Sequence, residues 1–145
     1  MVKYLIDAKV NIDEIDGSGR TALFYACKIG NYDIINCLLE NGANCFHQDD
    51  YGYQALLYAC KHNNIKIVKR LINEGVNINA RSKNGKTALI VACEFNHIHI
   101  VQYLIKNGAN VNIFDIKRQT ALVKSLINGN FEITKYLIEH DANLN

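Results

Sequence analysis

The sequence contains no proline and no run of apolar residues longer than six, as from Ala88 to Cys93. A helix that spans a bilayer needs about 20 apolar residues, so no membrane-spanning segment is expected. The N-terminus, MVKYLIDAKVNIDEID, has charges inside its apolar stretch and lacks the pattern of a secretory signal peptide. An excess of charge is also missing, because 16 basic and 14 acidic residues leave a net charge of +2. Binding to nucleic acid through bulk charge is therefore not expected.

The composition is that of a folded globular protein. The chain has 145 residues, of which 49% are hydrophobic and 21% are charged, and both fractions are close to globular averages. We therefore expect one soluble domain over residues 1–145 and no long disordered tail. Five cysteines form an odd set in a chain without a signal peptide, which favours a reducing compartment and a cytoplasmic location.

A repeat of 33 residues organises the sequence. The pair Ala-Leu begins at residues 22, 55, 88 and 121, and Gly-Ala-Asn or Gly-Val-Asn begins at residues 42, 75 and 108. This register divides the chain into a C-terminal half-repeat, 1–15, and four full repeats, 16–48, 49–81, 82–114 and 115–145. Periods of this length are typical of repeat architectures, in which each unit packs only on its neighbours.

The third full repeat illustrates the predicted local structure. Thr87 is placed to cap a short helix that continues through Cys93. Asn96 lies where other repeats have glycine, and both residues tolerate the left-handed conformation that ends a helix. An apolar stripe predicts a second helix over residues 98–106, and residues 111–115 are expected to form a hairpin-like loop.

These motifs resemble the ankyrin repeat, a 33-residue unit with a T-P-L-H-x-A opening, a G-H between its helices and an L-L-x-x-G-A-N-V-N close. The corresponding segments are TALFYA, QALLYA, TALIVA and TALVKS, then GNYDII, NNIKIV, NHIHIV and GNFEIT, then LLENGANCF, LINEGVNIN, LIKNGANVN and LIEHDANLN. The resemblance covers essentially the whole chain. It implies an all-α solenoid of helix-turn-helix units with hairpin-like loops, acting as a protein–protein interaction module without a cofactor.

Some residues depart from the family pattern. Alanine replaces the proline in all four repeats, and the family's histidine is replaced by Phe24, Leu57, Ile90 and Val123. The loss of the histidine hydrogen bonds implies a greater reliance on apolar contacts. The last repeat departs most, because Arg118 and Asp141 stand where other repeats have glycine. The resemblance further implies that Asp16, Asp49 and Asp115 brace their loops through hydrogen bonds.

The register also gives a structural interpretation of residues that look like chemical sites. Cys27, Cys60 and Cys93 share one repeat position and are expected to be small core thiols. His97 and His99 face different sides of a helix, so we expect no metal there. No Ser/His/Asp, Cys/His or paired-carboxylate set stands outside the repeat pattern, and we expect no catalytic activity.

By resemblance, the residues that contact a partner lie on the loop tips and at the ends of the first helices, on the concave face of the stack. The register assigns them to Asp50, Tyr51, Tyr53, Lys61, His62, Arg81, Lys83, Lys86, Glu94, Phe95, Phe114, Ile116, Lys117 and Ile127. Equivalent positions are Gly17, Ser18, Arg20, Lys28 and Ile29 in the first full repeat, and Asn84, Gln119 and Asn128 in later ones. Aromatic residues ringed by Lys and Arg are typical of interface hot spots.

The charge pattern and the chain ends indicate which kinds of partner the surface could bind. Arg81, Lys83, Lys86, Lys117 and Arg118 form a basic cluster that favours a protein partner of acidic character.

Neither end has the polar cap of a soluble solenoid, because the sequence begins in mid-repeat, with Tyr4, Leu5 and Ile6 near its start, and ends at Leu144-Asn145. We therefore expect a segment of a longer array, or ends that pack on another chain, including end-to-end self-association. A structural spacer is the alternative function, and a uniformly polar concave face would favour it.

Overall fold

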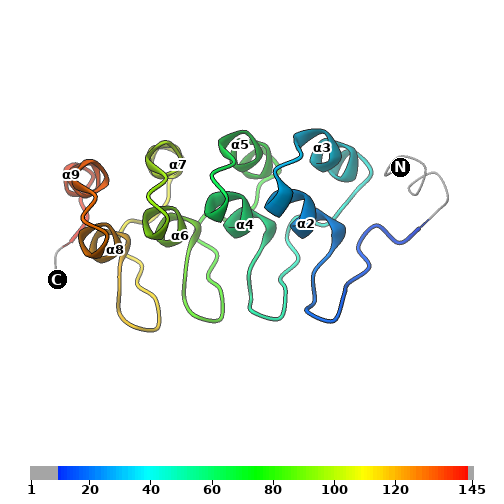
Figure 1. Ribbon diagram of the computed structural model, residues 1–145, viewed down its shortest axis with the longest axis horizontal. Helices are drawn as coiled ribbons and strands as arrows, with labels where there is room; N and C mark the ends of the chain where they lie inside the picture. The colour runs from blue at the N-terminus through cyan, green and yellow to red at the C-terminus, as the bar shows by residue number, and fades with distance from the viewer. Residues whose placement is uncertain (1–9, 144–145) are drawn as a thin grey trace. The chain divides into compact units, whose positions relative to one another are not determined.

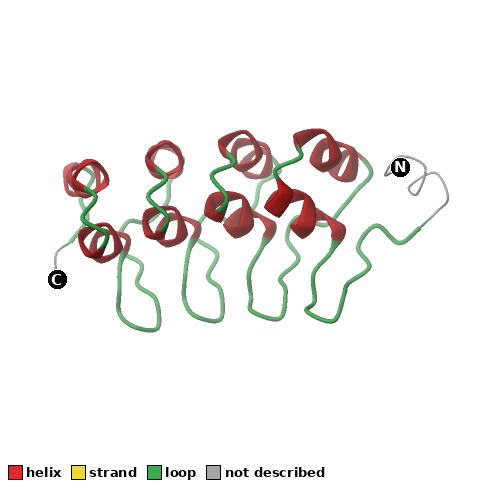
Figure 2. Ribbon diagram, viewed as in Figure 1, coloured by secondary structure: helices red, strands yellow, loops and turns green. Residues whose placement is uncertain are grey.

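The computed structural model describes residues 10–143, and within that range the chain consists of helices and loops with no β-strand (Figure 2). The eight helices described are α2 (Ala22–Ile29), α3 (Tyr32–Glu40), α4 (Ala55–Lys61), α5 (Ile65–Asn73), α6 (Ala88–Glu94), α7 (Ile98–Lys106), α8 (Ala121–Ile127) and α9 (Phe131–Glu139). Each predicted full repeat contributes one pair of helices, which confirms the all-α helix-turn-helix architecture. The predicted half-repeat, 1–15, falls largely outside the described residues, as do Tyr4, Leu5, Ile6 and Leu144-Asn145.

The helices group into two compact units. Unit 1 ends at Val76 and contains α2 to α5, and unit 2 begins at Asn77 and contains α6 to α9. Within unit 1, α2 packs on α4 and α3 packs on α5, and within unit 2, α6 packs on α8 and α7 packs on α9 (Figure 1). In each unit, the first helices of two successive repeats therefore lie side by side. None of the helices in residues 10–143 combines the length and the apolar character that a membrane span requires.

Apolar side chains occupy the positions where the family pattern has histidine. Phe24, Leu57 and Ile90 are each only 1% exposed, and Val123, at the fourth of these positions, is half-buried. They bury large apolar area at the sites where a hydrogen-bonding side chain would otherwise link loops, which agrees with the predicted reliance on apolar contacts. The three cysteines of the register, Cys27, Cys60 and Cys93, are fully buried. This burial confirms that they are core thiols.

Short polar side chains begin several helices. The Thr87 hydroxyl accepts a hydrogen bond of 3.3 Å from the Ile90 amide at the start of α6, as the sequence predicts. Asn31 caps the second helix of its repeat through a 3.1 Å hydrogen bond from the Ile34 amide. Such caps satisfy amides that have no partner inside the helix.

Left-handed residues end the first helices and shape the loops. Asn96 has φ 62°, so it adopts the conformation of Gly30, which has φ 82°. Arg118 and Asp141 also take positive φ angles, 58° and 64°. The last repeat therefore differs from the other full repeats in sequence but keeps their backbone conformation at these two positions. A side chain in this region costs about 1 kcal/mol, a cost that surrounding contacts must offset.

Candidate recognition surface

Aspartates at one repeat position hold the loops in shape. In unit 1, Oδ1 of Asp49 accepts hydrogen bonds of 2.9 Å from the amides of Tyr51 and Tyr53. In unit 2, Oδ1 of Asp115 accepts from the amides of Lys117 and Gln119 at 2.9 and 3.0 Å. These contacts confirm the predicted bracing role. These hydrogen bonds also fix the backbone positions from which the neighbouring side chains project.

Large apolar side chains at the predicted contact positions are exposed in both units. The exposed fraction is 57% for Tyr51 in unit 1, and 66% for Ile116 and 64% for Ile127 in unit 2. Phe95 and Phe114 are each 42% exposed. Tyr53 differs from the expectation of an exposed ring, because it is half-buried with its ring centroid 5.6 Å from that of Tyr58. Part of the Tyr53 side chain therefore packs against Tyr58 and part of it is exposed.

A cavity of about 180 Å³ opens in unit 1 between the first helices of two repeats. The side chains that line it are Arg20, Phe24, Tyr25, Lys28, Tyr58, Lys61 and His62. Arg20 lies before α2, while Tyr25 and Lys28 lie on α2, and Lys61 ends α4. Three of the lining residues, Arg20, Lys28 and Lys61, are basic, and none is acidic.

The guanidinium of Arg20 is held from several sides. Its Nε lies 3.4 Å from Oδ2 of Asp49, and its Cζ lies 5.8 Å from the ring centre of Tyr51 and 5.7 Å from that of Tyr58. Burial alone would lower the pKa of Arg20, but the hydroxyl of Tyr25, together with Tyr58 and Asp49, raises it. Burial, together with the neighbouring Asp49, raises the pKa of Tyr58 to about 12. The cavity therefore has a fixed cation and a protonated phenol.

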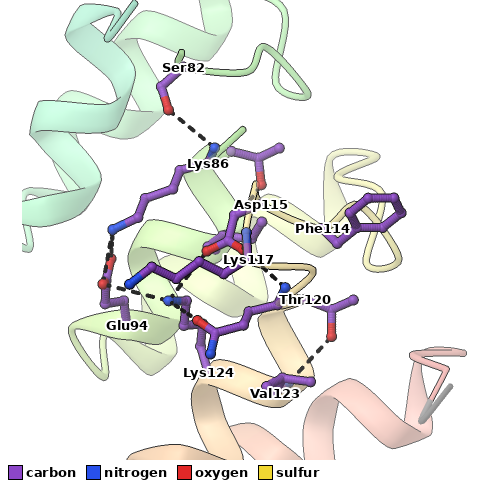
Figure 3. Close-up of polar contacts among 12 residues, drawn as sticks. Ser82, Lys86, Glu94, Phe114, Asp115, Lys117, Thr120, Val123 and Lys124 are labelled. Atoms are coloured by element: carbon purple, nitrogen blue, oxygen red, sulfur yellow. Dashed lines mark hydrogen bonds and ion pairs between the residues drawn. The ribbon is translucent and has the colours of Figure 1, made fainter. Parts of the chain in front are cut away.

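A second cavity of about 180 Å³ lies in unit 2, and two acids, Glu94 and Asp115, are among its lining residues. Glu94 faces two lysines from different repeats (Figure 3): Oε2 lies 2.6 Å from Nζ of Lys86, and Oε1 lies 3.9 Å from Nζ of Lys124. Lys124 also pairs with Asp115, at 3.4 Å. Burial alone would raise the pKa of Asp115, but hydrogen bonds from loop amides and the charge of Lys124 hold it below its ordinary value.

The predicted basic cluster is divided among several internal contacts. Arg81 donates a hydrogen bond of 2.9 Å to the carbonyl oxygen of Phe114. The guanidinium carbons of Arg81 and Arg118 lie 6.0 and 4.9 Å from the Phe114 ring centre. Lys86 is engaged by Glu94, whereas Lys83 and Lys117 are exposed. Two arginines of the cluster therefore contact the Phe114 ring, and the charge of Lys86 is compensated by Glu94 in the same chain.

Arg20, Lys28, Lys61 and His62 stand at partner-contacting positions predicted from the repeat register, whereas Tyr25 and Tyr58 were not predicted to line this cavity. A signal for the two tyrosines was available. Each follows a loop aspartate by nine residues, and each hydroxyl donates to that aspartate, Tyr25 to Asp16 and Tyr58 to Asp49. A search for residues that recur at a fixed offset from the loop aspartate would have found them.

Among the described residues, no group of three or more His, Cys, Asp or Glu side chains is arranged to hold a metal ion. The family model described as ankyrin repeats (3 copies) matches residues 1–82 and again residues 69–145. Comparison with curated proteins identified no relative of the chain. The two matches together cover every residue of the sequence, and their unit is the helix pair and loop described above.

Proposed function

Because the chain belongs to the ankyrin repeat family, whose repeats generally serve as protein-interaction modules, we propose that it binds a partner protein through its loop tips and first-helix ends. The proposed role is recognition without catalysis or a cofactor. The 33-residue register runs through the whole sequence, so we propose that residues 1–145 form one array with the repeat boundaries predicted above. The free thiols support a reducing, cytoplasmic location.

The main support for the proposal is that both units expose large apolar side chains on loop tips or at the ends of first helices. Tyr51 in unit 1 and Ile116, Phe114 and Phe95 in unit 2 lie on loop tips or at first-helix ends. A spacer would be expected to present polar side chains there, since exposed aromatics add a risk of aggregation without a benefit. Aromatic anchors surrounded by charge are typical of interface hot spots.

The proposed contact set keeps the residues that the sequence assigns: Asp50, Tyr51, Tyr53, Lys61, His62, Arg81, Lys83, Lys86, Glu94, Phe95, Phe114, Ile116, Lys117 and Ile127. The structure gives these residues unequal exposure. Tyr51 and Ile116 have the accessible area that an anchor needs, whereas Tyr53 and Lys86 are also engaged in contacts within the chain. We expect the anchors to account for most of the affinity.

The test is affinity capture from a lysate of the source cells. The bait is compared with a variant in which Tyr51, Phe95, Phe114 and Ile116 are all alanine. Removal of a hot-spot side chain costs about 2 kcal/mol or more, so the partner should bind the variant at least about 30-fold more weakly. In a matched control, Phe46 and Ile138 are both changed to alanine. These two side chains are 55% and 51% exposed and lie outside the contact set. Equal recovery by all three chains would favour the spacer.

Self-association is a second kind of contact that one surface supports. Leu126 and Phe131 of the last helix pair are 52% and 79% exposed, whereas Cys93, the register equivalent of Leu126, is fully buried. We propose that this face packs on another copy of the chain. Sedimentation velocity should then show association that rises with concentration and that Phe131→Glu abolishes, and a monomer at all concentrations would refute it.

A further inference from the structure

The cavities of units 1 and 2 share three lining positions that are 66 residues apart. Arg20 corresponds to Lys86, Lys28 to Glu94, and Tyr58 to Lys124. In both cavities, two of these side chains come from the earlier repeat and the third comes from the first helix of the later repeat. Corresponding repeat positions therefore line a cavity in each unit, but the side chains at these positions differ.

The two cavities differ in their acids, because Glu94 and Asp115 both line the unit 2 cavity, whereas no carboxylate lines the unit 1 cavity. In unit 2, Glu94 lies against Lys86 and Lys124 and supplies the negative charge that these cations need (Figure 3). In unit 1, the position of Glu94 is occupied by Lys28, another cation. Lys61 adds a further cation to the lining, so the unit 1 cavity gathers positive charge and contains no acid of its own.

The two aspartates near the unit 1 cavity are committed to the loops. Asp49 has a side chain with no exposed surface, and its oxygens accept from two loop amides, from the Tyr58 hydroxyl and from Arg20. Asp16 accepts from the amides of Ser18 and Arg20 and from the Tyr25 hydroxyl. Neither is among the lining residues, and they anchor Arg20 and the tyrosines instead of filling the recess.

We propose that the unit 1 cavity binds the carboxylate side chain of an Asp or Glu residue on the partner protein. This carboxylate takes the place that Glu94 holds in unit 2. Arg20 offers the remaining donors of a guanidinium whose side chain is 28% exposed, and Lys28 and Lys61 supply charge. The volume suits a single side chain, since an engineered protein cavity of about 150 Å³ accommodates benzene. The inference rests on the proposed recognition function and names its ligand.

The site should distinguish a carboxylate from the amide of the same shape. A carboxylate satisfies several donors at once, whereas an amide presents one weaker acceptor and an N–H₂ group that faces the cations. Loss of one charge-assisted hydrogen bond corresponds to about tenfold or more in affinity. Bulk attraction is a small effect here, because the net charge of the chain is only +2.

The experiment uses the full chain and two blocked peptides, Gly-Glu-Gly and Gly-Gln-Gly, at matched ionic strength. NMR follows the Arg20 Nε–Hε resonance and the backbone amides of Lys28, Tyr58 and Lys61. We expect the glutamate peptide to give saturable shifts at these positions and the glutamine peptide to bind at least about tenfold more weakly. Equal shifts from both peptides, or shifts centred elsewhere, would overturn the proposal.

Two substitutions exchange the properties of the cavities. Lys28→Glu introduces the internal acid of unit 2 into unit 1 and should abolish binding of the glutamate peptide there. Glu94→Gln removes one of the two acids of the unit 2 cavity and should create a new set of shifts at Lys86, whereas Lys124 remains paired with Asp115. Lys66→Glu makes the same change in charge on α5, away from the lining, and should leave binding within about twofold. Circular dichroism confirms that each variant is folded, and unchanged binding by the Lys28→Glu chain would refute the assignment.

The outcome separates this inference from the broader proposal. If the captured partner binds the Lys28→Glu chain with unchanged affinity but is lost from the aromatic variant, recognition stands and the carboxylate site is overturned. If the glutamate peptide binds in a Lys28-dependent way while no partner is captured, the site stands and the recognition proposal fails. Loss of the partner from both variants supports both.

Discussion

The hydroxyl of Tyr58 donates a hydrogen bond of 2.8 Å to Oδ2 of Asp49, nine residues earlier in the chain. The same offset joins Tyr25 to Asp16 in unit 1, and it joins Lys124 to Asp115 as an ion pair in unit 2. In each case, one aspartate braces its loop with Oδ1 and connects that loop to the following helix with Oδ2. The loop tips are consequently held as part of the helical framework.

The first prediction concerns this aspartate. Asp49→Ala leaves two loop amides, the Tyr58 hydroxyl and Arg20 without their acceptor in a buried place. We expect the free energy of unfolding to fall by about 2–4 kcal/mol in urea titrations followed by circular dichroism. The matched change Asp16→Ala, at an exposed aspartate with the same pattern of contacts, should cost less, because water can replace the lost acceptor. Equal losses would show that burial is not the cause.

The second prediction is a loss of stability in acid that depends on Asp115. Its pKa in the folded chain lies below the ordinary value of 3.8, so the folded state binds fewer protons than the unfolded state. The resulting stabilisation is complete above the unfolded pKa and is lost as the pH falls from about 4 through the folded pKa. Urea titrations between pH 6 and pH 2 should show this decline, and Asp115→Asn should make it shallower. An unchanged slope would contradict the assignment.

The backbone was largely predictable from the sequence because its determinants are local. Asn96 marks the end of α6, and the second helix occupies residues 98–106 as predicted, since apolar periodicity and left-handed residues act within a few positions. The bracing role of Asp49 was implied by the resemblance to the ankyrin repeat, and the structure confirms it through hydrogen bonds that span at most four residues.

The side-chain pairing at the candidate site was not predictable in the same way. Lys124 reaches Glu94 and Asp115 from a neighbouring repeat, and the position of its ammonium group depends on how far two helices are separated. Tyr53 occupies a register position that predicts exposure, yet its ring packs near Tyr58. Repeat register gives the position of a residue, but the reach and the neighbours of its side chain decide whether it is available to a partner.

The third prediction compares two glycines with similar backbones. Gly30 and Gly42 have φ angles of 82° and 85°, so an alanine at either place is strained by about 1 kcal/mol. A Cβ added to Gly42 meets nothing within 4 Å, whereas at Gly30 it would lie 2.8 Å from Oδ1 of Asn64. Asn64 donates a hydrogen bond to the Cys27 carbonyl oxygen at 3.2 Å, and this contact would have to shift. Gly30→Ala should therefore lower the free energy of unfolding by about 1 kcal/mol more than Gly42→Ala.

Thermal or urea unfolding of the two alanine variants, measured in parallel, tests this comparison. The left-handed conformation is common to both, so the difference between them isolates the contact with Asn64. Equal destabilisation would indicate that Asn64 moves aside without loss. A Gly30→Asn variant serves as a second check, because asparagine occupies this register position at Asn63 and Asn96 with φ angles of 58° and 62°.

The fourth prediction concerns the reactivity of four of the five thiols, Cys27, Cys37, Cys60 and Cys93. Burial raises the pKa of Cys27 from 9.0 to about 12, which reduces its thiolate fraction at neutral pH roughly a thousandfold. Burial also raises the pKa of Cys60 and Cys93. Cys37 is only half-buried and is open to reagent in the folded chain. A thiol reagent such as a disulfide dye should therefore modify Cys37 first, and the three core thiols should react only when the surrounding helices open.

The rate of this slow modification carries more information than its final extent. If the core thiols react through opening of the structure, their rates should rise steeply with urea, because the exposed surface increases on opening. Cys60 and Cys93 report on units 1 and 2, respectively. A Cys37→Ala variant removes the fast phase and leaves the slow phases unchanged. Rapid modification of Cys93 in the absence of urea would mean that the core position is accessible, and it would contradict the assignment of these cysteines to a closed core.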